Sequence, residues 1–91
     1  MVSNPPVESL LQFPTDYPIK VVARTSTDLR PCIDAIVRQH CPNLKDEQIM
    51  ERSSKAANFT ALTYHIVADS REQVTSLVNA LVDAEGVLMV I

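Results

Sequence analysis

The segment from Asn58 to Leu81 constrains the fold of this chain most, because it changes from a strand pattern to a helix pattern within a few residues. From Thr60 onward apolar side chains alternate along the chain, and a period of two places every second residue on one side of a strand. After Asp69 the apolar residues recur three and four positions apart, which lines one face of an α-helix. The inward-facing residues expected from the two patterns are Thr60, Leu62, Tyr64, Ile66, Ala68, Val74, Leu77, Val78 and Leu81.

Capping signals mark both ends of this predicted helix. The Ser70 hydroxyl can accept a hydrogen bond from the backbone N–H of Gln73, and the Gln73 side chain can reach back to the N–H of Ser70, as in a capping box. Gly86 can adopt the left-handed conformation that ends a helix, and residues 87–91 are apolar strand formers. The chain is therefore expected to end as strand, helix, strand.

The first half of the chain follows the same plan with weaker signals. Residues 1–9 include two consecutive prolines and are expected to form a flexible tail, because proline lacks a backbone donor. Alternation predicts a strand over 19–24, and helical periodicity predicts a helix that begins between residues 27 and 30 and ends before Pro42. An edge strand over 47–52 and a hairpin loop are expected to lead into the strand that begins near Thr60.

Two local expectations complete the pattern. Residues Thr15 to Pro18 have turn chemistry and are expected to precede the first strand rather than belong to it. In the first helix, Asp34 falls with Arg30 and Arg38 on the side away from the apolar face, so its carboxylate is expected in solvent.

The order strand, helix, strand, strand, helix, strand has few compact solutions. Each strand–helix–strand crossover must be right-handed, and both helices must cover the same apolar face of the sheet. We therefore expect an α+β protein with a ferredoxin-like βαββαβ two-layer sandwich, in which an antiparallel four-stranded sheet has the order 4-1-3-2. Residues 10–91 would form this single domain.

Composition excludes several classes of protein. Hydrophobic residues make up 46% of the 91 residues and charged residues 21%, which is typical of a soluble globular domain. The apolar run at residues 87–91 is far shorter than the roughly 20 residues that cross a bilayer, and residues 1–6 lack the pattern of a signal peptide. We expect a cytoplasmic protein that does not interact with membranes.

Charge and glycine content exclude further partners. The formal net charge is −3 and no run of Lys or Arg is present, whereas nucleic-acid binding usually requires a basic stripe. The single glycine excludes the glycine-rich loops that bind nucleotide phosphates. The sequence therefore predicts neither nucleic-acid binding nor nucleotide binding through such loops, and it calls for no cofactor.

The residues with catalytic potential do not converge. His40 and Cys41 are neighbours at a helix end and point about 100° apart, which makes a poor nucleophile–base pair. His65 lies out of phase with the inward residues of its strand and is expected on the opposite sheet face. Cys32 and Cys41 are too far apart on one helix for a disulfide and are expected to be reduced thiols. We expect neither a metal site nor an enzyme.

The face of the sheet opposite the helices is the main candidate site, because it is too apolar for a bare surface, and such patches usually bind a partner. Two alternatives remain open: the segment Leu10 to Phe13 folds over this face, or the strand phase is off by one residue. The residues assigned to a partner-binding face are Val22, Arg24, Phe59, Ala61, Thr63, His65, Val67, Leu88 and Val90, with Lys20 beside them.

Two loops are candidate ligand sites. Ser53, Ser54 and Lys55 place two hydroxyls and an ammonium group at a hairpin tip, which suits a small anion, although such residues more often form only a polar turn. The second loop, after the first strand, offers the hydroxyls of Thr25, Ser26 and Thr27.

Several short motifs are spread over the chain from Leu10 to Ile91. They are Leu10-Leu11-Gln12-Phe13-Pro14, Lys20-Val21, Arg38-Gln39-His40-Cys41-Pro42, Ser53-Ser54-Lys55, Asn58-Phe59, Glu72-Gln73-Val74 and Met89-Val90-Ile91. With these motifs the chain resembles the YbeD-like family of small bacterial proteins. The resemblance implies a βαββαβ fold like that of the ACT small-molecule regulatory domains, a cytoplasmic location and no known enzymatic activity. Members of the family carry the provisional label of lipoate regulatory protein.

Two functions of different classes follow. The first is a regulatory or adaptor domain without enzymatic activity, which associates through the sheet face with a partner protein or with a second copy of itself. The second is a sensor of ACT type that binds an amino acid or related metabolite near the loop from Arg24 to Asp28 or at a dimer seam. An enzyme that uses Cys41 or His65 is the weakest reading of the sequence.

Overall fold

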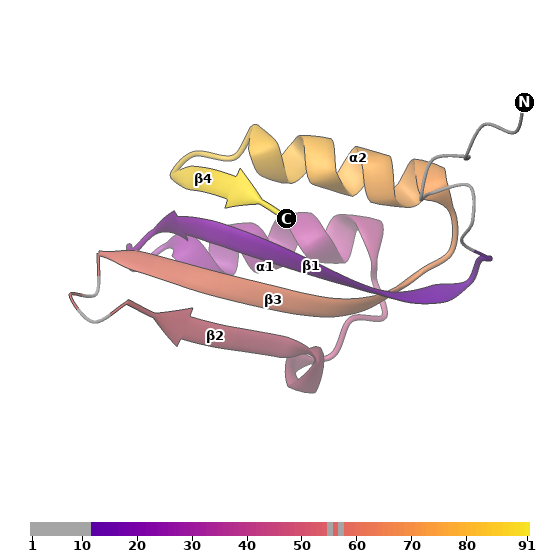
Figure 1. Ribbon diagram of the computed structural model, residues 1–91, viewed down its shortest axis with the longest axis horizontal. Coiled ribbons are helices and arrows are strands. Elements are labelled where there is room, and N and C mark those ends of the chain that lie inside the picture. The colour runs from indigo at the N-terminus through magenta and orange to yellow at the C-terminus, as the bar shows by residue number, and fades with distance from the viewer. Residues whose placement is uncertain (1–11, 55, 57) are drawn as a thin grey trace, which may run out of the picture.

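A computed structural model of the protein, which describes residues 12–54, 56 and 58–91, contains one antiparallel sheet of four strands with two helices on one face (Figure 1). The strand order is β2-β3-β1-β4, which is 4-1-3-2 read from the other edge, so the ferredoxin-like expectation is confirmed. The elements are β1 (Thr15–Arg24), α1 (Leu29–His40), the 3₁₀ helix η2 (Asp46–Gln48), β2 (Ile49–Ser53), β3 (Phe59–Ala68), α2 (Arg71–Val82) and β4 (Val87–Val90).

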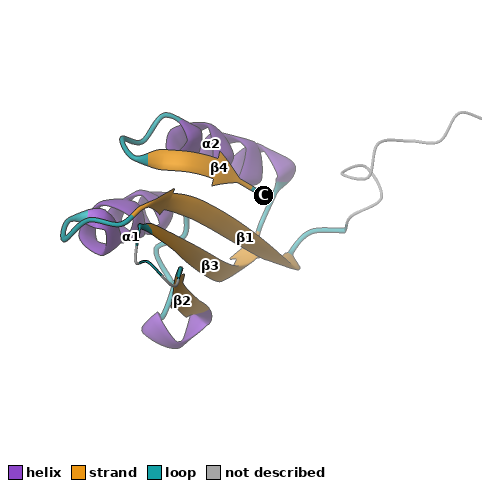
Figure 2. Cartoon of the chain, turned by 60° about the vertical axis from the view of Figure 1, so that its left-hand side comes forward, coloured by secondary structure: helices purple, strands orange, loops and turns teal. Residues whose placement is uncertain are grey.

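The core lies in a single layer between the sheet and the helices (Figure 2). Along β3 the even-numbered side chains are buried, whereas Phe59, His65 and Val67 are exposed, as the alternation predicted. The α2 residues Leu77 and Leu81 are fully buried against this layer. The core side chains of β3 are Thr60, Leu62, Tyr64, Ile66 and Ala68.

β1 is longer than the sequence pattern indicated. The expectation that Thr15 to Pro18 form a turn is wrong, because these residues pair with the end of β3. Lys20 exchanges two backbone hydrogen bonds with Ile91, at 3.1 and 2.8 Å. The nitrogen of Pro18 faces the same edge, beyond Ile91, so its missing N–H removes no hydrogen bond to β4.

The prediction for Asp34 is also wrong, because its side chain is buried between α1 and β3. The Tyr64 hydroxyl donates to Asp34 Oδ1 at 2.5 Å, and the Arg30 guanidinium donates to both carboxylate oxygens, at 3.2 and 3.3 Å from Nε. Arg30 also pairs with Glu51 at 2.8 Å. A buried tyrosine hydroxyl needs a polar partner, and Asp34 supplies it.

The ends of α2 agree with the sequence in part. The Ser70 hydroxyl accepts from the Gln73 N–H at 3.1 Å, as predicted. Gly86 has the expected left-handed φ of 85°, but the prediction that it ends the helix is wrong, because α2 ends at Val82 with Asp83 as its C-cap and Gly86 lies in the turn before β4. The Gln73 side chain, however, does not bond to the N–H of Ser70. It accepts from the N–H of Asp69 at 2.6 Å and donates to the carbonyl of His40 at 2.7 Å, which ties the start of α2 to the end of α1.

The second strand begins later than expected. Residues 46–48 form η2 instead of the start of a strand, and β2 runs only from Ile49 to Ser53 at the edge of the sheet. The predicted tail over residues 1–9 lies outside the described residues, as do Leu10 and Leu11. Phe13 is described, and it packs against the core and lines a hollow with Val74 and Val78 of α2.

Candidate functional site

The sheet face opposite the helices is the most extensive candidate site. Directly paired residues of an antiparallel sheet project to the same side, so the strand pairing identifies the members of this face. We call it the open face, and within the described residues it comprises Asp16, Pro18, Lys20, Val22, Arg24, Met50, Arg52, Phe59, Ala61, Thr63, His65, Val67, Met89 and Ile91.

The open face contains most of the residues assigned to it from the sequence. The strand pairing and burial place on it Val22, Arg24, Phe59, Ala61, Thr63, His65 and Val67.

The placement of Val90 on this face is wrong. Val90 pairs with Val21 and packs against the core, and Met89 takes its place opposite Val22. The cause is a bulge at Leu88, which is an extra residue in β4 without a counterpart on β1 and is 48% exposed.

Sequence reasoning missed six members of the open face, of which Asp16 and Pro18 were overlooked because residues 15–18 were expected to form a turn. Met50 and Arg52 pair with Thr63 and Ala61, and they were overlooked because the polar stretch before Ile49 gave no clear phase for β2. Met89 and Ile91 were missed because an uninterrupted apolar run has no alternation from which a phase can be read. Both methionines are more than half exposed.

Charge on the open face is unevenly distributed. Lys20, Arg24 and Arg52 lie toward the end of the face where β1 finishes, and Asp16 lies at the other end, opposite Val67. Within the described residues the ion pairs involve Arg30 and Arg38, and none involves these three cations. We call the part of the open face between the Lys20 row and the Arg24 row the basic half.

In the first loop predicted to bind a ligand, the Ser54 hydroxyl and N–H form hydrogen bonds with the backbone of the same hairpin. The Ser54 hydroxyl accepts from the N–H of Phe59 at 3.2 Å, and the N–H of Ser54 donates to the carbonyl of Phe59 at 2.9 Å, which closes the hairpin. Ser53 ends β2 and is exposed. Lys55 lies outside the described residues.

The second predicted loop borders a hollow of about 340 Å³. Thr25 does not contribute its hydroxyl, which hydrogen-bonds to that of Thr60 at 2.7 Å. Ser26 lines the hollow, and Thr27 is exposed nearby. The charged residues that border the hollow are Arg24, Asp28 and Glu85.

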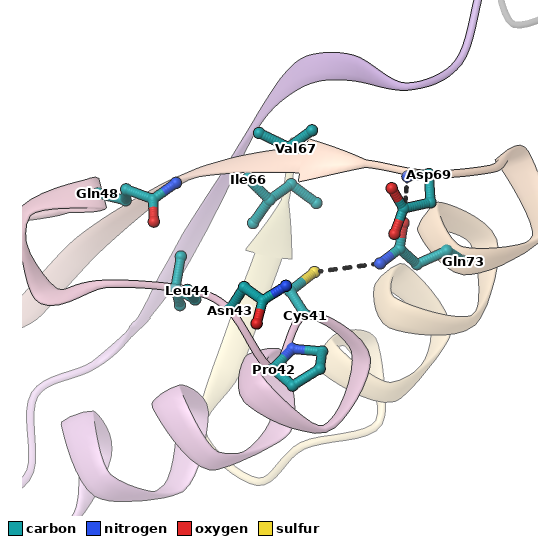
Figure 3. A pocket seen from close by; sticks show the side chains of 9 residues that line it. All are labelled: Cys41, Pro42, Asn43, Leu44, Gln48, Ile66, Val67, Asp69 and Gln73. Carbon is teal, nitrogen blue, oxygen red and sulfur yellow. Dashed lines mark hydrogen bonds between the residues drawn. The ribbon is translucent and has the colours of Figure 1, made fainter.

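A third hollow, of about 250 Å³, lies between the end of α1 and the start of α2 (Figure 3). Its polar groups bond to one another, because the Gln73 amide donates to the His40 carbonyl and approaches the Cys41 sulfur at 3.6 Å. Burial, and next the Asp69 carboxylate, raise the pKa of the Cys41 thiol. A thiol that resists ionisation is a poor nucleophile, so this hollow does not support a catalytic role for Cys41.

The histidines do not complete such a site. His65 is exposed on the open face, whereas the Nδ1 atom of His40 lies 3.0 Å from the carbonyl of Ile36 in its own helix. Among the described residues, no group of three or more His, Cys, Asp and Glu side chains is placed to bind a metal ion. Neither described helix has the length and hydropathy of a membrane span.

The fold and the open face define the class of this domain. Its structure is similar to the crystal structure of the ACT domain from GTP pyrophosphokinase of Chlorobium tepidum, with a TM-score of 0.67 and 18% identity over 85% of this chain and 97% of that one. The solution structure of the same domain gives a TM-score of 0.65 and 15% identity over 84% of each chain. The domain therefore has an ACT-like fold.

The family is given by sequence. The chain belongs to the family described as protein of unknown function (DUF493), whose model matches residues 8–91. Relatives are bacterial UPF0250 proteins. One from Bordetella pertussis is 38% identical over 81 residues, which is 89% of both chains, and one from Nitrosomonas europaea is 34% identical over 84 residues, which is 92% of this chain and 97% of the relative. The resemblance to the YbeD-like family is confirmed.

Proposed function

We propose that this protein is a regulatory or adaptor domain without enzymatic activity, and that it acts by binding another protein through the open face. The observation that carries this proposal is the contiguous apolar surface formed by Val22, Phe59, Ala61, Met89 and Ile91 on the side of the sheet without helices. Soluble monomers rarely leave such a surface uncovered unless it binds something.

Several observations support this function over catalysis. The one buried thiol of the described chain has a raised pKa, and the two histidines lie on different elements and do not share a hollow. The open face, in contrast, consists of side chains held by paired strands, which makes it a preformed surface. The provisional lipoate label of the family names one pathway in which to look for the partner.

The test uses two matched variants of the full chain. Phe59→Asp places a carboxylate on the open face, and Val82→Asp places one at an exposed apolar residue of α2, on the other side of the molecule. We expect the native chain and Val82→Asp to retain the same partner from a bacterial lysate, and Phe59→Asp to lose it. The partner would then be purified and titrated into labelled protein while the backbone amide shifts are followed.

The outcome is decided by the location of the shift changes. Changes confined to residues of the four strands support binding through the open face. Equal binding by Phe59→Asp and the native chain, or shift changes confined to α1 and α2, would refute the proposal.

A second candidate function is a sensor of a small zwitterionic metabolite. The hollow beside the β1–α1 loop favours it, because Arg24 and the acidic residues Asp28 and Glu85 border it with charges of both signs, which suit a carboxylate and an ammonium group. Titration with amino acids and lipoate precursors would be followed through the amide shifts of residues 24–28 and 85–86. Absence of shift changes there at millimolar ligand would exclude this candidate.

A further inference from the structure

The basic half of the open face combines positive charge with apolar surface in a chain whose formal net charge is −3. Lys20 and Arg24 lie on either side of Val22 along β1, and none of the open-face carboxylates falls between them. Arg52 lies in the same row as Val22, at the edge of the sheet on β2. Within the described residues these cations have no acidic partner, so their charges are available to a molecule that binds there.

The spacing of these charges matches a helix. Lys20 and Arg24 are four residues apart on β1, about 13 Å along the strand, which is close to the roughly 10–12 Å diameter of an α-helix with its side chains. The row between the charges is apolar and runs from Ala61 through Val22 to Met89. A helix laid along this row would bury an apolar stripe and bring acidic side chains on its two flanks to Lys20 on one side and to Arg24 on the other, with Arg52 at the β2 end of the row.

A second copy of the chain fits this surface poorly. A two-fold axis through the Val22 row would bring the cations of the two copies together, because an isologous interface opposes the same patch on both subunits. An axis through the Lys20 row would pair Arg24 with Asp16 of the second copy, but it would place Lys20 against its own equivalent. Like charges opposed in this way disfavour association.

Nucleic acid and anionic lipid also fit less well. Proteins that bind single-stranded nucleic acid on a sheet stack several bases on aromatic side chains, and Phe59 is the one aromatic side chain that the structure places on the open face. Binding to an anionic membrane surface usually requires a cluster of about four to eight basic residues. Three cations around an apolar row suit a protein segment better.

We propose, building on the function proposed above, that the basic half of the open face binds an acidic amphipathic helix of another protein. The apolar stripe of that helix packs on Ala61, Val22 and Met89, its flanking carboxylates pair with Lys20 and Arg24, and a carboxylate near one end pairs with Arg52. The bound helix forms a third layer on the sheet, which buries the apolar face that α1 and α2 leave uncovered.

The experiment uses two designed peptides as probes. Both are helices of about 18 residues, or five turns, with the same leucine stripe. One carries glutamate on both flanks, and the other carries lysine. Each is titrated into the labelled full chain, and amide shifts and dissociation constants are measured at about 0.05 M and about 0.5 M salt. We expect the glutamate peptide to shift amides of the basic half, and to bind more weakly at high salt.

Charge reversal supplies the control. In the triple variant Lys20→Glu, Arg24→Glu, Arg52→Glu, the glutamate peptide should bind roughly tenfold more weakly and the lysine peptide correspondingly more tightly. Met89→Asp should weaken both peptides, and Val82→Asp should weaken neither.

Distinct results would overturn this inference and the proposed function. Equal binding of the two peptides to the native chain, or no effect of the triple variant, would refute the acidic partner while leaving binding through the open face intact. Shift changes caused by phosphatidylglycerol vesicles or oligouridine but not by the glutamate peptide would also refute it, as would a stable dimer in sedimentation. Full retention of partner binding by both Met89→Asp and Phe59→Asp would refute the proposed function itself.

Discussion

Replacement of Tyr64 by phenylalanine removes a single oxygen atom from a fully buried position and leaves the aromatic ring that fills the core. The hydroxyl donates to Asp34 Oδ1 at 2.5 Å. In the variant, Asp34 keeps its hydrogen bonds from Arg30, whose Nη2 lies 3.1 Å from Oδ2, but it loses its shortest hydrogen bond, which is the one from Tyr64. The substitution therefore isolates one charge-assisted hydrogen bond between α1 and β3.

The magnitude follows from the charge and burial of the pair. A hydrogen bond to a charged group contributes about 1.5–3 kcal/mol to the free energy of unfolding. Because Arg30 continues to neutralise Asp34, we expect a loss of about 2 kcal/mol for Tyr64→Phe. For a domain of this size each kcal/mol lowers Tm by roughly 4–8 °C, so the midpoint should fall by roughly 8–16 °C.

Urea unfolding, followed by circular dichroism, measures this loss. The matched control is Tyr17→Phe, since Tyr17 is half-buried and its hydroxyl has no hydrogen-bond partner among the residues that the structure describes. We expect the control to change the free energy of unfolding by less than about 0.5 kcal/mol. The slope of free energy against urea should be unchanged in both variants, because neither changes the surface exposed on unfolding.

Tyr64→Phe should also change how the stability of the protein depends on pH. Burial, and next the hydrogen bond to Asp34, raise the pKa of the Tyr64 hydroxyl well above its ordinary value. In the unfolded chain this hydroxyl loses its proton near pH 10, whereas in the folded protein it keeps it. The unfolded state therefore binds fewer protons, and stability falls as pH rises from about 10 through the folded-state pKa, by up to about 1.4 kcal/mol per pH unit. Tyr64→Phe should lose this contribution.

Two results would refute this reasoning. One is a free energy of unfolding for Tyr64→Phe within about 0.5 kcal/mol of the native value at neutral pH. The other is an alkaline fall in stability that is as steep in Tyr64→Phe as in the native protein. In either case the hydroxyl would not stabilise the contact between α1 and β3.

Three further predictions concern the turn before β4, the start of α2 and the two thiols. Gly86→Ala should cost about 1 kcal/mol in urea unfolding, since φ is 85° and no atom lies within 4 Å of an added Cβ; a neutral result would contradict the need for glycine. Ser70→Ala should cost about 1 kcal/mol through the lost cap, and Ser76→Ala, at an exposed position of the same helix, should cost less. Iodoacetamide near pH 8 should alkylate exposed Cys32 before buried Cys41, as mass spectrometry would show; the reverse order would contradict the raised Cys41 pKa.

The fold could be predicted from the sequence where periodicity was unbroken. β3 alternates over its whole length and α2 has both a cap and an apolar stripe, so these two elements and the inward phase of Tyr64 followed directly. Asp34 could not be placed in this way. Helical periodicity gives the direction of a side chain around the helix axis, but it does not show how far the neighbouring sheet covers that side of the helix. Its burial depends on Tyr64, which comes from a different part of the chain.

The candidate site was predictable only in its centre. The outward residues of β1 and β3 followed from alternation, whereas those of β2 and β4 did not. β4 is a continuous apolar run, and its bulge at Leu88 exchanges Met89 for Val90 on the open face. The position of a bulge is set by how two strands pair, so the sequence of one strand alone does not reveal it.

Pro18 affects how readily the protein can aggregate through the edge of its sheet. β1 extends past the end of β4, so on that side the backbone from Thr15 to Pro18 has no described strand beside it and could template the addition of a foreign strand. Because Pro18 has no backbone N–H, it interrupts the row of hydrogen-bonding groups along this edge, and proline is commonly found on the edge strands of sheets. Pro18, which made the start of β1 resemble a turn in the sequence, therefore also protects the protein from aggregation through one of its two longest strands.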